Sequence, residues 1–477
     1  MKSDDNSAVV STGVDGLDEV MHGGFTQGET FLVEGHPGAG KTMLALQWAM
    51  DGMRKGEPAL FVGFAETQSE LNKIAHSNGW DLSGLNVLEI ARPEDQHTLF
   101  HPSEVELDKT LNRLRDELDR MKPTRLILDS LTELRLMAET PFRYYRELLA
   151  LKNLLHDRKC TTLLTDSPAQ MAAQTLVSGL ISLEQYFPEY GGVRRRLSLH
   201  KMRGRDYADG YHDYIIVKGG LQVFPRVVAA EHRTQPPSRL LSSGVDSVDQ
   251  LLNGGITSGT STLIVGPAGS GKSSMAIAFA AAAAKRGEPV TIYTFDEPPE
   301  TLLSQSDLIG ASIEKYIETG LVRVQQVDPV EFSPHQLAHL IRTEVEKRNI
   351  SVLVIDSING YVHAMPEAQF LTAQMHELLA YLGQQGVSSI IIMGQYGLTD
   401  AVLAPVNASY LTDNLISLRL FEFNGEMRRA IAVIKRRGGT HKNTIHEITL
   451  GPSGIEVGGL MPTFYNGHGP PGNSAVL

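Results

Sequence analysis

The sequence predicts an α/β protein of two tandem domains, each a mostly parallel sheet flanked by helices with an antiparallel hairpin at the sheet edge. Three observations support this prediction. The chain has 477 residues, which is too long for one hydrophobic core of ordinary size. Its two halves repeat the same motifs in the same order. Within each half, short apolar segments alternate with helical ones, as in sheets built from βαβ units.

The repeat is carried by several pairs of segments. Residues 11–30 and 242–261 share the pattern S-x-G-V-D-x-x-D followed by G-G-x-T-x-G, at an offset of 231 residues. At the same offset GHPGAGKT recurs as GPAGSGKS, and RKGEPALFVGFAET recurs as KRGEPVTIYTFDEP. RLILDSL pairs with VLVIDSI at an offset of 227, and HKMRG pairs with IKRRG at 234. A gene duplication explains this shared order far better than chance.

Domain boundaries follow from the repeat and from composition. We expect a first domain at 1–230 and a second at 241–460. The segment 231–240 between them is polar and contains two consecutive prolines, which is typical of a linker. The last residues, 461–477, are rich in Gly, Pro and Asn and are expected to form a flexible tail.

The elements of the first half illustrate the alternation. Buried strands are expected at 29–35, 59–64, 125–130 and 160–167, and helices at 41–56, 106–121 and 142–158. Later segments lose the helical period. We expect antiparallel hairpins there, formed by 180–186 with 194–204 and by 415–423 with 427–438.

Composition excludes several classes of protein. The net charge of −12 argues against a broad basic surface for nucleic acid, although a basic inner channel stays open as an alternative. Cys160 is the only cysteine, so we expect a core residue and no disulfide. No apolar run reaches 18 residues, and the acidic N-terminus does not resemble a signal peptide. We therefore expect a cytoplasmic protein without a membrane partner.

Two segments fit the phosphate-binding pattern G-x-x-x-x-G-K-[ST], each between an expected strand and an expected helix. Glycines let backbone N–H groups converge on phosphate oxygens, and the helix adds its positive end. We expect Lys41 and Lys272 to contact the β- and γ-phosphates of ATP, and Thr42 and Ser273 to bind Mg²⁺. The candidate ATP-binding residues are Gly35, Gly38, Ala39, Gly40, Lys41, Thr42, Gly266, Gly269, Ser270, Gly271, Lys272, Ser273 and Ser274.

Carboxylates at strand ends complete these sites. Asp129 and Asp356 each end a buried strand, so we expect them to assist Mg²⁺ binding; a helix N-cap is the alternative. Glu66, Asp296 and Glu297 follow the second strand of their domains and are candidates to orient or deprotonate the nucleophile. A solvated carboxylate at a loop start is the alternative reading.

These motifs together resemble the KaiC family of RecA-like ATPases, over the chain up to about residue 457. The leader pattern, the two P-loops, the F-x-E carboxylate site and the K-x-R-G hairpin carry the resemblance. The family implies two RecA-like P-loop domains in a double-ring homohexamer, with ATP and Mg²⁺ bound between neighbouring subunits. It implies that Lys201 with Arg203, and Lys435 with Arg437, reach the neighbour's γ-phosphate. Arg429 matches a further nucleotide-contacting arginine of this group.

The chain departs from the family pattern in three places. The family has two adjacent glutamates after Phe, whereas this chain has Ala65-Glu66 and Asp296-Glu297. The Ala65 change makes first-domain turnover an open question. At the family's phosphorylated Ser-Thr pair the chain has Ser409-Tyr410, so Ser409 is the expected acceptor of serine/threonine autokinase activity.

Three functions follow as hypotheses. The first is an ATP-hydrolysing ring with serine autokinase activity, serving signalling or timing together with regulatory proteins. The second is a strand-binding motor of the recombinase or helicase type, although no zinc finger or aromatic–basic nucleic-acid module is present in the sequence. The third is a scaffold that holds ATP with little turnover.

Overall fold

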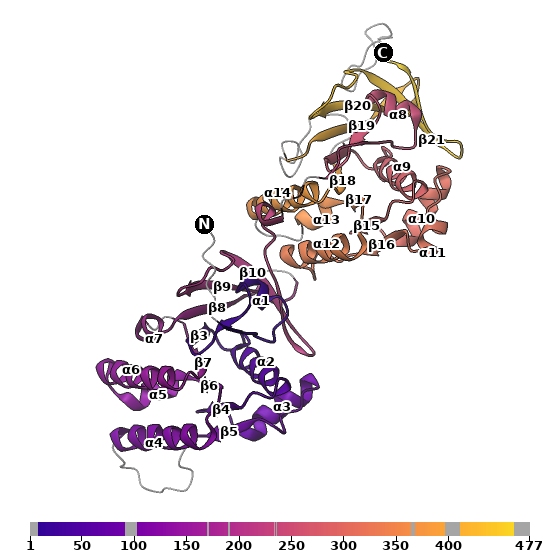
Figure 1. Ribbon diagram of the computed structural model, residues 1–477. Coiled ribbons are helices and arrows are strands. Elements are labelled where there is room, and N and C mark those ends of the chain that lie inside the picture. The colour runs from indigo at the N-terminus through magenta and orange to yellow at the C-terminus, as the bar shows by residue number, and fades with distance from the viewer. Residues whose placement is uncertain are drawn as a thin grey trace, which may run out of the picture. The chain divides into compact units, whose positions relative to one another are not determined.

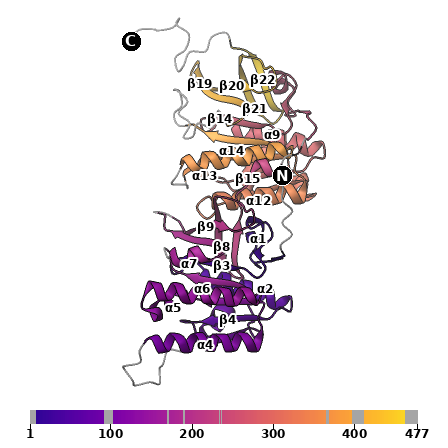
Figure 2. The same cartoon turned by 60° about the vertical axis from the view of Figure 1, so that its left-hand side comes forward.

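The computed structural model describes residues 8–90, 103–168, 171–188, 191–232, 234, 236–363, 368–395 and 411–461. The chain divides into two compact units, Met1–Arg226 and Val227–Leu477. Each unit contains one nine-stranded sheet and one separate two-stranded sheet, with helices on both faces of the large sheet (Figures 1 and 2). The α/β class and the tandem arrangement predicted from the sequence are therefore confirmed.

The first unit begins with a small sheet of β1 and β2, and its large sheet has the order β11-β10-β9-β8-β3-β7-β6-β4-β5. Its strands are β1 (Val9–Val10), β2 (Phe25–Thr26), β3 (Thr30–Gly35), β4 (Ala59–Gly63), β5 (Asn86–Glu89), β6 (Arg125–Asp129), β7 (Thr161–Asp166), β8 (Gly179–Tyr186), β9 (Arg194–Met202), β10 (Tyr211–Val217) and β11 (Gly220–Phe224). Its helices are α1 (Leu17–Val20), α2 (Lys41–Arg54), α3 (Gln68–Asn78), α4 (Ser103–Met121), α5 (Leu131–Ala138), α6 (Pro141–Asp157) and α7 (Met171–Leu176).

The second unit repeats this plan, with the order β22-β21-β20-β19-β14-β18-β17-β15-β16 in its large sheet. Its strands are β12 (Leu240–Leu241), β13 (Ile256–Thr257), β14 (Ser261–Gly266), β15 (Val290–Thr294), β16 (Val322–Gln326), β17 (Val352–Asp356), β18 (Ser388–Gly394), β19 (Asn414–Phe423), β20 (Glu426–Arg436), β21 (Ile445–Gly451) and β22 (Gly454–Leu460). Its helices are η1 (a 3₁₀ turn, Ala229–His232), α8 (Asp246–Leu251), α9 (Lys272–Lys285), α10 (Pro299–Leu308), α11 (Glu314–Glu318), α12 (Pro334–Arg348), α13 (Ile358–His363) and α14 (Ala368–Gln384).

Six strands of each large sheet are parallel. In the first unit these run from β5 to β8, with β3 between β7 and β8. Parallel strands end at the same edge of a sheet, so residues at their carboxyl ends lie close together. The register places Asp129 opposite Gly63, and Asp166 opposite Glu34. This edge therefore collects the residues that follow β3, β4, β6 and β7.

The remaining pairings are antiparallel, and they extend further than the sequence indicated. The predicted hairpins are present as β8 with β9 and as β19 with β20. Each is continued by two further antiparallel strands, β10 and β11 or β21 and β22, so the hairpin is not itself the edge. The segment of β10, Tyr-His-Asp-Tyr-Ile-Ile-Val, is rich in residues that favour strands, so its composition was a signal that could have predicted it.

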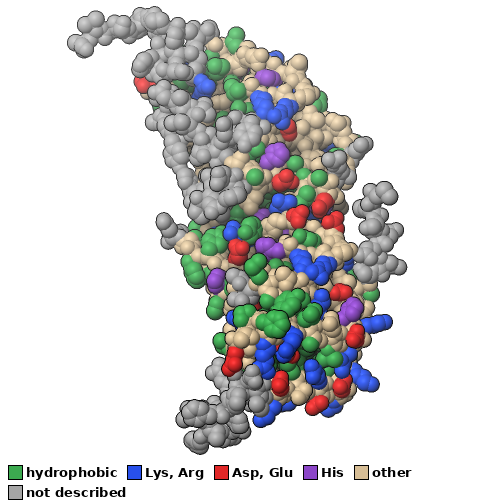
Figure 3. Space-filling view, turned by 90° about the vertical axis from the view of Figure 1, so that its left-hand side faces the viewer, with side chains coloured by type: hydrophobic (Ala, Val, Ile, Leu, Met, Phe, Trp, Pro, Cys, Tyr) green, Lys and Arg blue, Asp and Glu red, His purple; other side chains and the backbone are tan. Residues whose placement is uncertain are grey.

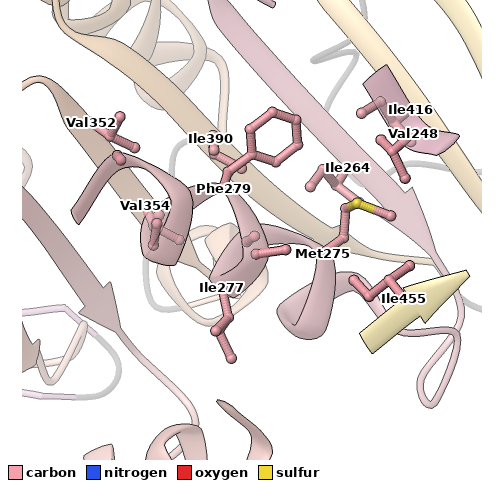
Figure 4. Packing of buried hydrophobic residues seen from close by; sticks show 14 of the residues in the cluster. Val248, Ile264, Met275, Ile277, Phe279, Val352, Val354, Ile390, Ile416 and Ile455 are labelled. Atoms are coloured by element: carbon pink, nitrogen blue, oxygen red, sulfur yellow. The ribbon is translucent and has the colours of Figure 1, made fainter. Parts of the chain in front are cut away.

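Both faces of each large sheet are covered by apolar side chains. In the second unit, α9 packs its Met275, Ile277 and Phe279 near Ile264 and Val354 of the sheet (Figure 4). In the first unit, Leu44, Leu46 and Trp48 of α2 belong to the core on one face, and leucines of α4 and α6 to the core on the other. The two faces are therefore buried, which accounts for the continuous apolar runs of the parallel strands.

Two further features concern the ends of elements. Cys160 is buried just before β7, as expected for a core residue. The first segment of the second unit packs on α14: the backbone N–H of Ala229 donates to Glu377 at 3.2 Å, and Gln385 donates to the carbonyl of His232 at 2.9 Å. Within the described ranges, none of the helices has the length and apolar character that crossing a membrane requires.

Candidate nucleotide sites

The first P-loop connects β3 to α2 at the carboxyl edge of the first sheet. Gly38 and Gly40 have φ of 83° and 100°, a left-handed backbone that glycine adopts without strain. The Nζ atom of Lys41 donates to the carbonyl oxygens of Gly35 at 2.6 Å and His36 at 3.3 Å. Burial lowers the pKa of Lys41, and nearby carboxylates led by Asp129 act in the opposite direction. The loop thus holds its ammonium where phosphate oxygens would replace the carbonyls.

Asp129 lies beside this loop at the end of β6. Its Oδ2 accepts a hydrogen bond from the Thr42 hydroxyl at 2.7 Å, and its Oδ1 accepts one from the Thr165 hydroxyl. Burial raises the pKa of Asp129, and the two hydroxyl donors lower it. The peptide bond after Asp129 is cis, as is the bond after Asp356. A hydroxyl and a carboxylate in contact at a P-loop are oxygen donors of the kind that Mg²⁺ prefers.

The second P-loop repeats this geometry between β14 and α9. The Nζ atom of Lys272 donates to the carbonyl oxygen of Pro267 at 2.8 Å, and Gly271 has φ of 96°. Burial raises the pKa of Asp356 to about 6, and its hydrogen bond with Ser273 acts against this shift. The same hydroxyl–carboxylate pair therefore stands at the carboxyl edge of both sheets, and each pair fits Mg²⁺ held against a nucleotide.

A cavity of about 480 Å³ opens over the second P-loop. It brings together nine of the residues predicted from the sequence: Gly269, Gly271, Lys272, Ser273, Ser274, Asp296, Glu297, Asp356 and Arg429. Gly266 lies beneath the loop, where an added Cβ would come within 2.4 Å of the Leu418 carbonyl oxygen. A cavity of this size, with an ammonium, a hydroxyl and carboxylates in its wall, suits a nucleoside triphosphate and its cation.

The carboxylates after the second strand differ between the two sites. Glu66 is half-buried, and its Oε2 atom is buried without a hydrogen-bond partner. Burial, with the charge of Asp129 as the next cause, raises the pKa of Glu66 to about 7. In the second domain Asp296 accepts a hydrogen bond from Ser357 at 2.9 Å, and Glu297 accepts one from Gln305 at 2.9 Å. Burial thus makes Glu66 a better proton acceptor than a solvated glutamate.

The basic pair of the first domain lies at the other end of its sheet. Lys201 is opposite Leu180, and Leu180 is opposite Leu32, three residues before the P-loop glycine Gly35. Lys201 Nζ donates to the carbonyl of Gln174 in α7 at 2.9 Å. Arg203, two residues further from the P-loop, donates to the Thr175 carbonyl at 2.9 Å.

The second domain places its pair in the same way. Lys435 is opposite Leu415, which is opposite Leu263, again three residues before the P-loop glycine. Lys435 donates to the Thr412 carbonyl at 2.5 Å, and Arg437 lies 3.6 Å from Asp413. In both domains, the pair therefore lies away from the phosphate loop of its own domain.

Arg429 lies at the P-loop end of the second sheet. Its Nε donates to the carbonyl of Gly269 at 3.0 Å, within the P-loop of the same domain. Its place differs from that of the two basic pairs with which the sequence grouped it. Ser409 lies outside the described residues.

Sequence reasoning missed the first-domain counterpart of this arginine. The offset of 234 that relates Lys201 to Lys435 relates Arg195 to Arg429 (195 + 234 = 429). Arg195 is opposite Gln185, which donates to the Pro37 carbonyl of the P-loop at 2.9 Å. It also lies near Tyr214, whose hydroxyl donates to the Ala39 carbonyl: burial raises the pKa of Tyr214, and the charge of Arg195 lowers it. The repeat offset was the signal that could have found it.

Comparisons with known proteins agree with this architecture. The chain matches the family described as "ATPase: KaiC" twice, over residues 10–228 and 241–461. It is 26% identical over 467 residues to the circadian clock oscillator protein KaiC of Parathermosynechococcus lividus, covering 94% of this chain and 84% of that protein. It is 26% identical over 472 residues to the protein of the same name from Synechococcus elongatus, covering 94% and 89%. Two matches that together span both sheets and both P-loops show that the chain belongs to the KaiC family of ATPases.

Proposed function

We propose that this protein hydrolyses ATP at two unequal sites in a homohexameric double ring, with the basic pair of one subunit completing the site of its neighbour. The observation that carries the proposal is the opposite placement of two kinds of cation. Arg195 and Arg429 lie at the P-loop of their own domain, whereas Lys201 and Lys435 lie at the other end of the sheet. A cation at that end reaches a γ-phosphate only when a second copy supplies the phosphate, as in a closing head-to-tail ring.

Exposed apolar side chains on three helices of the first domain support a contact between copies. Phe142 and Met171, on α6 and α7, are 77% and 79% exposed, and Leu136 on α5 is 71% exposed. Met171 begins α7, and carbonyl groups in the last turn of the same helix accept hydrogen bonds from Lys201 and Arg203. Figure 3, viewed from the side of these helices, shows apolar side chains close to Lys and Arg. Such a surface gains free energy when another copy covers it.

The residues at each site have distinct parts in the reaction. Mg²⁺, held by the hydroxyl of Thr42 or Ser273 and assisted by Asp129 or Asp356, supplies charge neutralisation when bound. Lys41 and Lys272 hold the β- and γ-phosphates. Glu66 accepts the proton of the attacking water in the first domain.

In the second domain, Glu297, with Asp296 beside it, serves the same purpose. The trans cations Lys201, Arg203, Lys435 and Arg437 stabilise the charge that develops on the transferred phosphoryl group.

Subunit mixing tests the shared site. One variant carries Lys41→Ala and Lys272→Ala, which removes both P-loop ammonium groups. A second variant carries Lys201→Ala, Arg203→Ala, Lys435→Ala and Arg437→Ala. Each alone is expected to be inactive, and a mixture is expected to release phosphate because some interfaces join an intact P-loop to an intact basic pair. A control for the second variant removes two other basic side chains, by Lys109→Ala with Arg115→Ala on the exposed face of α4. It is expected to keep wild-type activity.

A mixture with no more activity than the sum of its parts would contradict the shared site. Mass measurement of the complex with and without ATP tests the hexamer separately, because a monomeric mass under both conditions would remove the ring from the proposal.

We also propose that the second domain phosphorylates Ser409 of this chain, in a signalling or timing role that involves regulatory proteins. Asp296 and Glu297 lie in the cavity above Lys272, where either could accept a hydroxyl proton. Incubation with γ-labelled ATP is expected to label the wild type and not Ser409→Ala. Equal labelling of the two proteins, or none in either, would reject this part.

A further inference from the structure

The first-domain site has no carboxylate at Ala65, but a second carboxylate lies close to the strand-end Asp129. Glu133, in the first turn of α5, accepts a hydrogen bond from the Ser130 hydroxyl at 2.8 Å. Ser130 directly follows Asp129 at the carboxyl edge of the sheet. Burial raises the pKa of Glu66, of Asp129 and of Asp166, and the negative charge of Glu133 adds to each rise as a smaller cause.

In the second domain, a carboxylate from another position in the chain fills the space that corresponds to Glu133. The offset of 227 between the strand-end aspartates relates Glu133 to Gly360 (133 + 227 = 360) and Ser130 to Ser357 (130 + 227 = 357). An added Cβ at Gly360 would lie 2.6 Å from Oδ1 of Asp296, so the carboxylate of Asp296 fills the space over this glycine. Ser357 donates to Oδ2 of that carboxylate at 2.9 Å. One serine position thus holds a carboxylate in both domains, from different places in the chain.

We propose that Glu133 supplies the second carboxylate of the first-domain ATP site. It replaces the carboxylate that is missing at Ala65 and has the role that Asp296 has in the second domain. The inference rests on the proposed function, in which Glu66 accepts the proton of the attacking water. Glu133 is a positioning residue, because it acts through Glu66. Its negative charge favours the protonated form of Glu66 and so makes that carboxylate a stronger base. The water oxygen bonds to the γ-phosphorus as its proton goes to Glu66, the bond from that phosphorus to the β–γ bridging oxygen breaks and ADP leaves. Glu66 returns the proton to solvent when the products are released.

Glu133→Gln tests this part without changing the size of the side chain. The full chain should also carry Glu297→Gln, which silences second-domain hydrolysis while leaving Lys272 and the Mg²⁺ ligands in place. Loss of the negative charge lowers the pKa of Glu66. We therefore expect the acid limb of kcat/KM to move to lower pH by about one unit, and the plateau to fall roughly three- to tenfold. KM for ATP should stay unchanged, because the phosphate ligands are intact.

A transplant provides the second arm. Ala65→Asp with Glu133→Gly gives the first domain the arrangement of the second, and it is expected to restore the acid limb to its wild-type position. Glu133→Gly alone should show the loss without recovery. Glu147→Gln, the same chemical change on α6, is the matched control and should leave rate and pH profile unchanged.

The outcomes separate the two claims. If Glu66→Gln abolishes hydrolysis in this background while Glu133→Gln has a wild-type rate and pH profile, the inference about Glu133 is overturned and the proposed function stands. If Glu66→Gln itself has no effect, the proposed first-domain chemistry fails, and the inference fails with it. A displaced acid limb that the transplant restores supports the inference, since a purely structural defect would not move the titration.

Discussion

The two domains have the same order of strands in the large sheet, but they differ in the charged side chains around that sheet. Where the first domain buries Arg125 against α2, the second has Val352; where the first has Asp51 on that helix, the second has Ala282. At the ATP sites, Glu66 has an unpartnered oxygen, whereas Glu297 is held by Gln305. Duplication thus preserved the phosphate loops while the surrounding polar groups diverged, which indicates that the loops require fixed geometry and their supports tolerate exchange.

The largest effect is expected from removing each P-loop lysine separately. Lys41→Ala and Lys272→Ala should each lower hydrolysis in their own domain about a thousandfold, because a preorganised charge on the phosphates is lost. Glu66 is the freer carboxylate, so Lys41→Ala should remove the larger share of total phosphate release. If Lys272→Ala removes nearly all of it, the first domain is a holding site. If neither variant changes phosphate release, the result favours the hypothesis of a scaffold that holds ATP with little turnover.

Arg125 is a buried arginine of the first domain whose counterpart in the second domain is Val352. Its side chain is 1% exposed, and it donates to Glu57 at 2.5 Å, to Asp51 at 3.1 Å and to the Trp48 carbonyl at 2.7 Å. Arg125→Ala leaves Asp51 without this partner, and we expect the free energy of unfolding to fall by about 3–5 kcal/mol. Chemical denaturation measures this.

The residues that the second domain has at these two positions provide the control for this prediction. Arg125→Val with Asp51→Ala reproduces the pair Val352 and Ala282, and it should recover much of the loss because no buried charge remains unpaired. Equal losses in the single and double variants would show that the network does not account for the effect.

The pH dependence of hydrolysis at low pH is a third property in which the first domain should differ from the second. Burial raises the pKa of Glu66 to about 7, and a base acts only when deprotonated. With Glu297→Gln in place, kcat/KM should be level above pH 7 and fall roughly tenfold per pH unit below it. A flat profile from pH 5 to 8 would exclude Glu66 as the base. The reciprocal variant, Glu66→Gln alone, reports the second domain for comparison.

The smallest expected effect concerns the amide that holds Glu297. Gln305→Leu removes the donor to Oε2, so the carboxylate becomes free for water, as Glu66 is. Second-domain hydrolysis, measured with Glu66→Gln present, should rise roughly threefold. The first-domain residue at this position is Ile74 (305 − 231 = 74), so the change copies an existing arrangement. A fall in rate would show instead that Gln305 aims the carboxylate productively.

Much of the fold followed from short-range signals. The strand before Lys41 and the helix after it were predicted within one or two residues, because continuous apolar runs and the glycine–lysine pattern are local. β10 and β11 were not predicted, although both segments are rich in strand-forming residues, because only their pairing with β9 and with each other shows that the sheet continues beyond the hairpin. The residues at the carboxyl edge were predicted as separate candidates, and the register of parallel strands brings them together.

The sequence alone determined the duplication, the two phosphate loops and the strand-end aspartates, because each is a pattern of neighbouring residues with one physical purpose. Tertiary structure decided which end of the sheet each cation occupies, separating Arg429 from Lys435 although only five residues lie between them along the chain. It also brought Glu133 to the hydroxyl of Ser130, next to the strand-end Asp129. Pairing between distant strands and helices sets such positions, and a repeat offset shows them only after the partner segments are known.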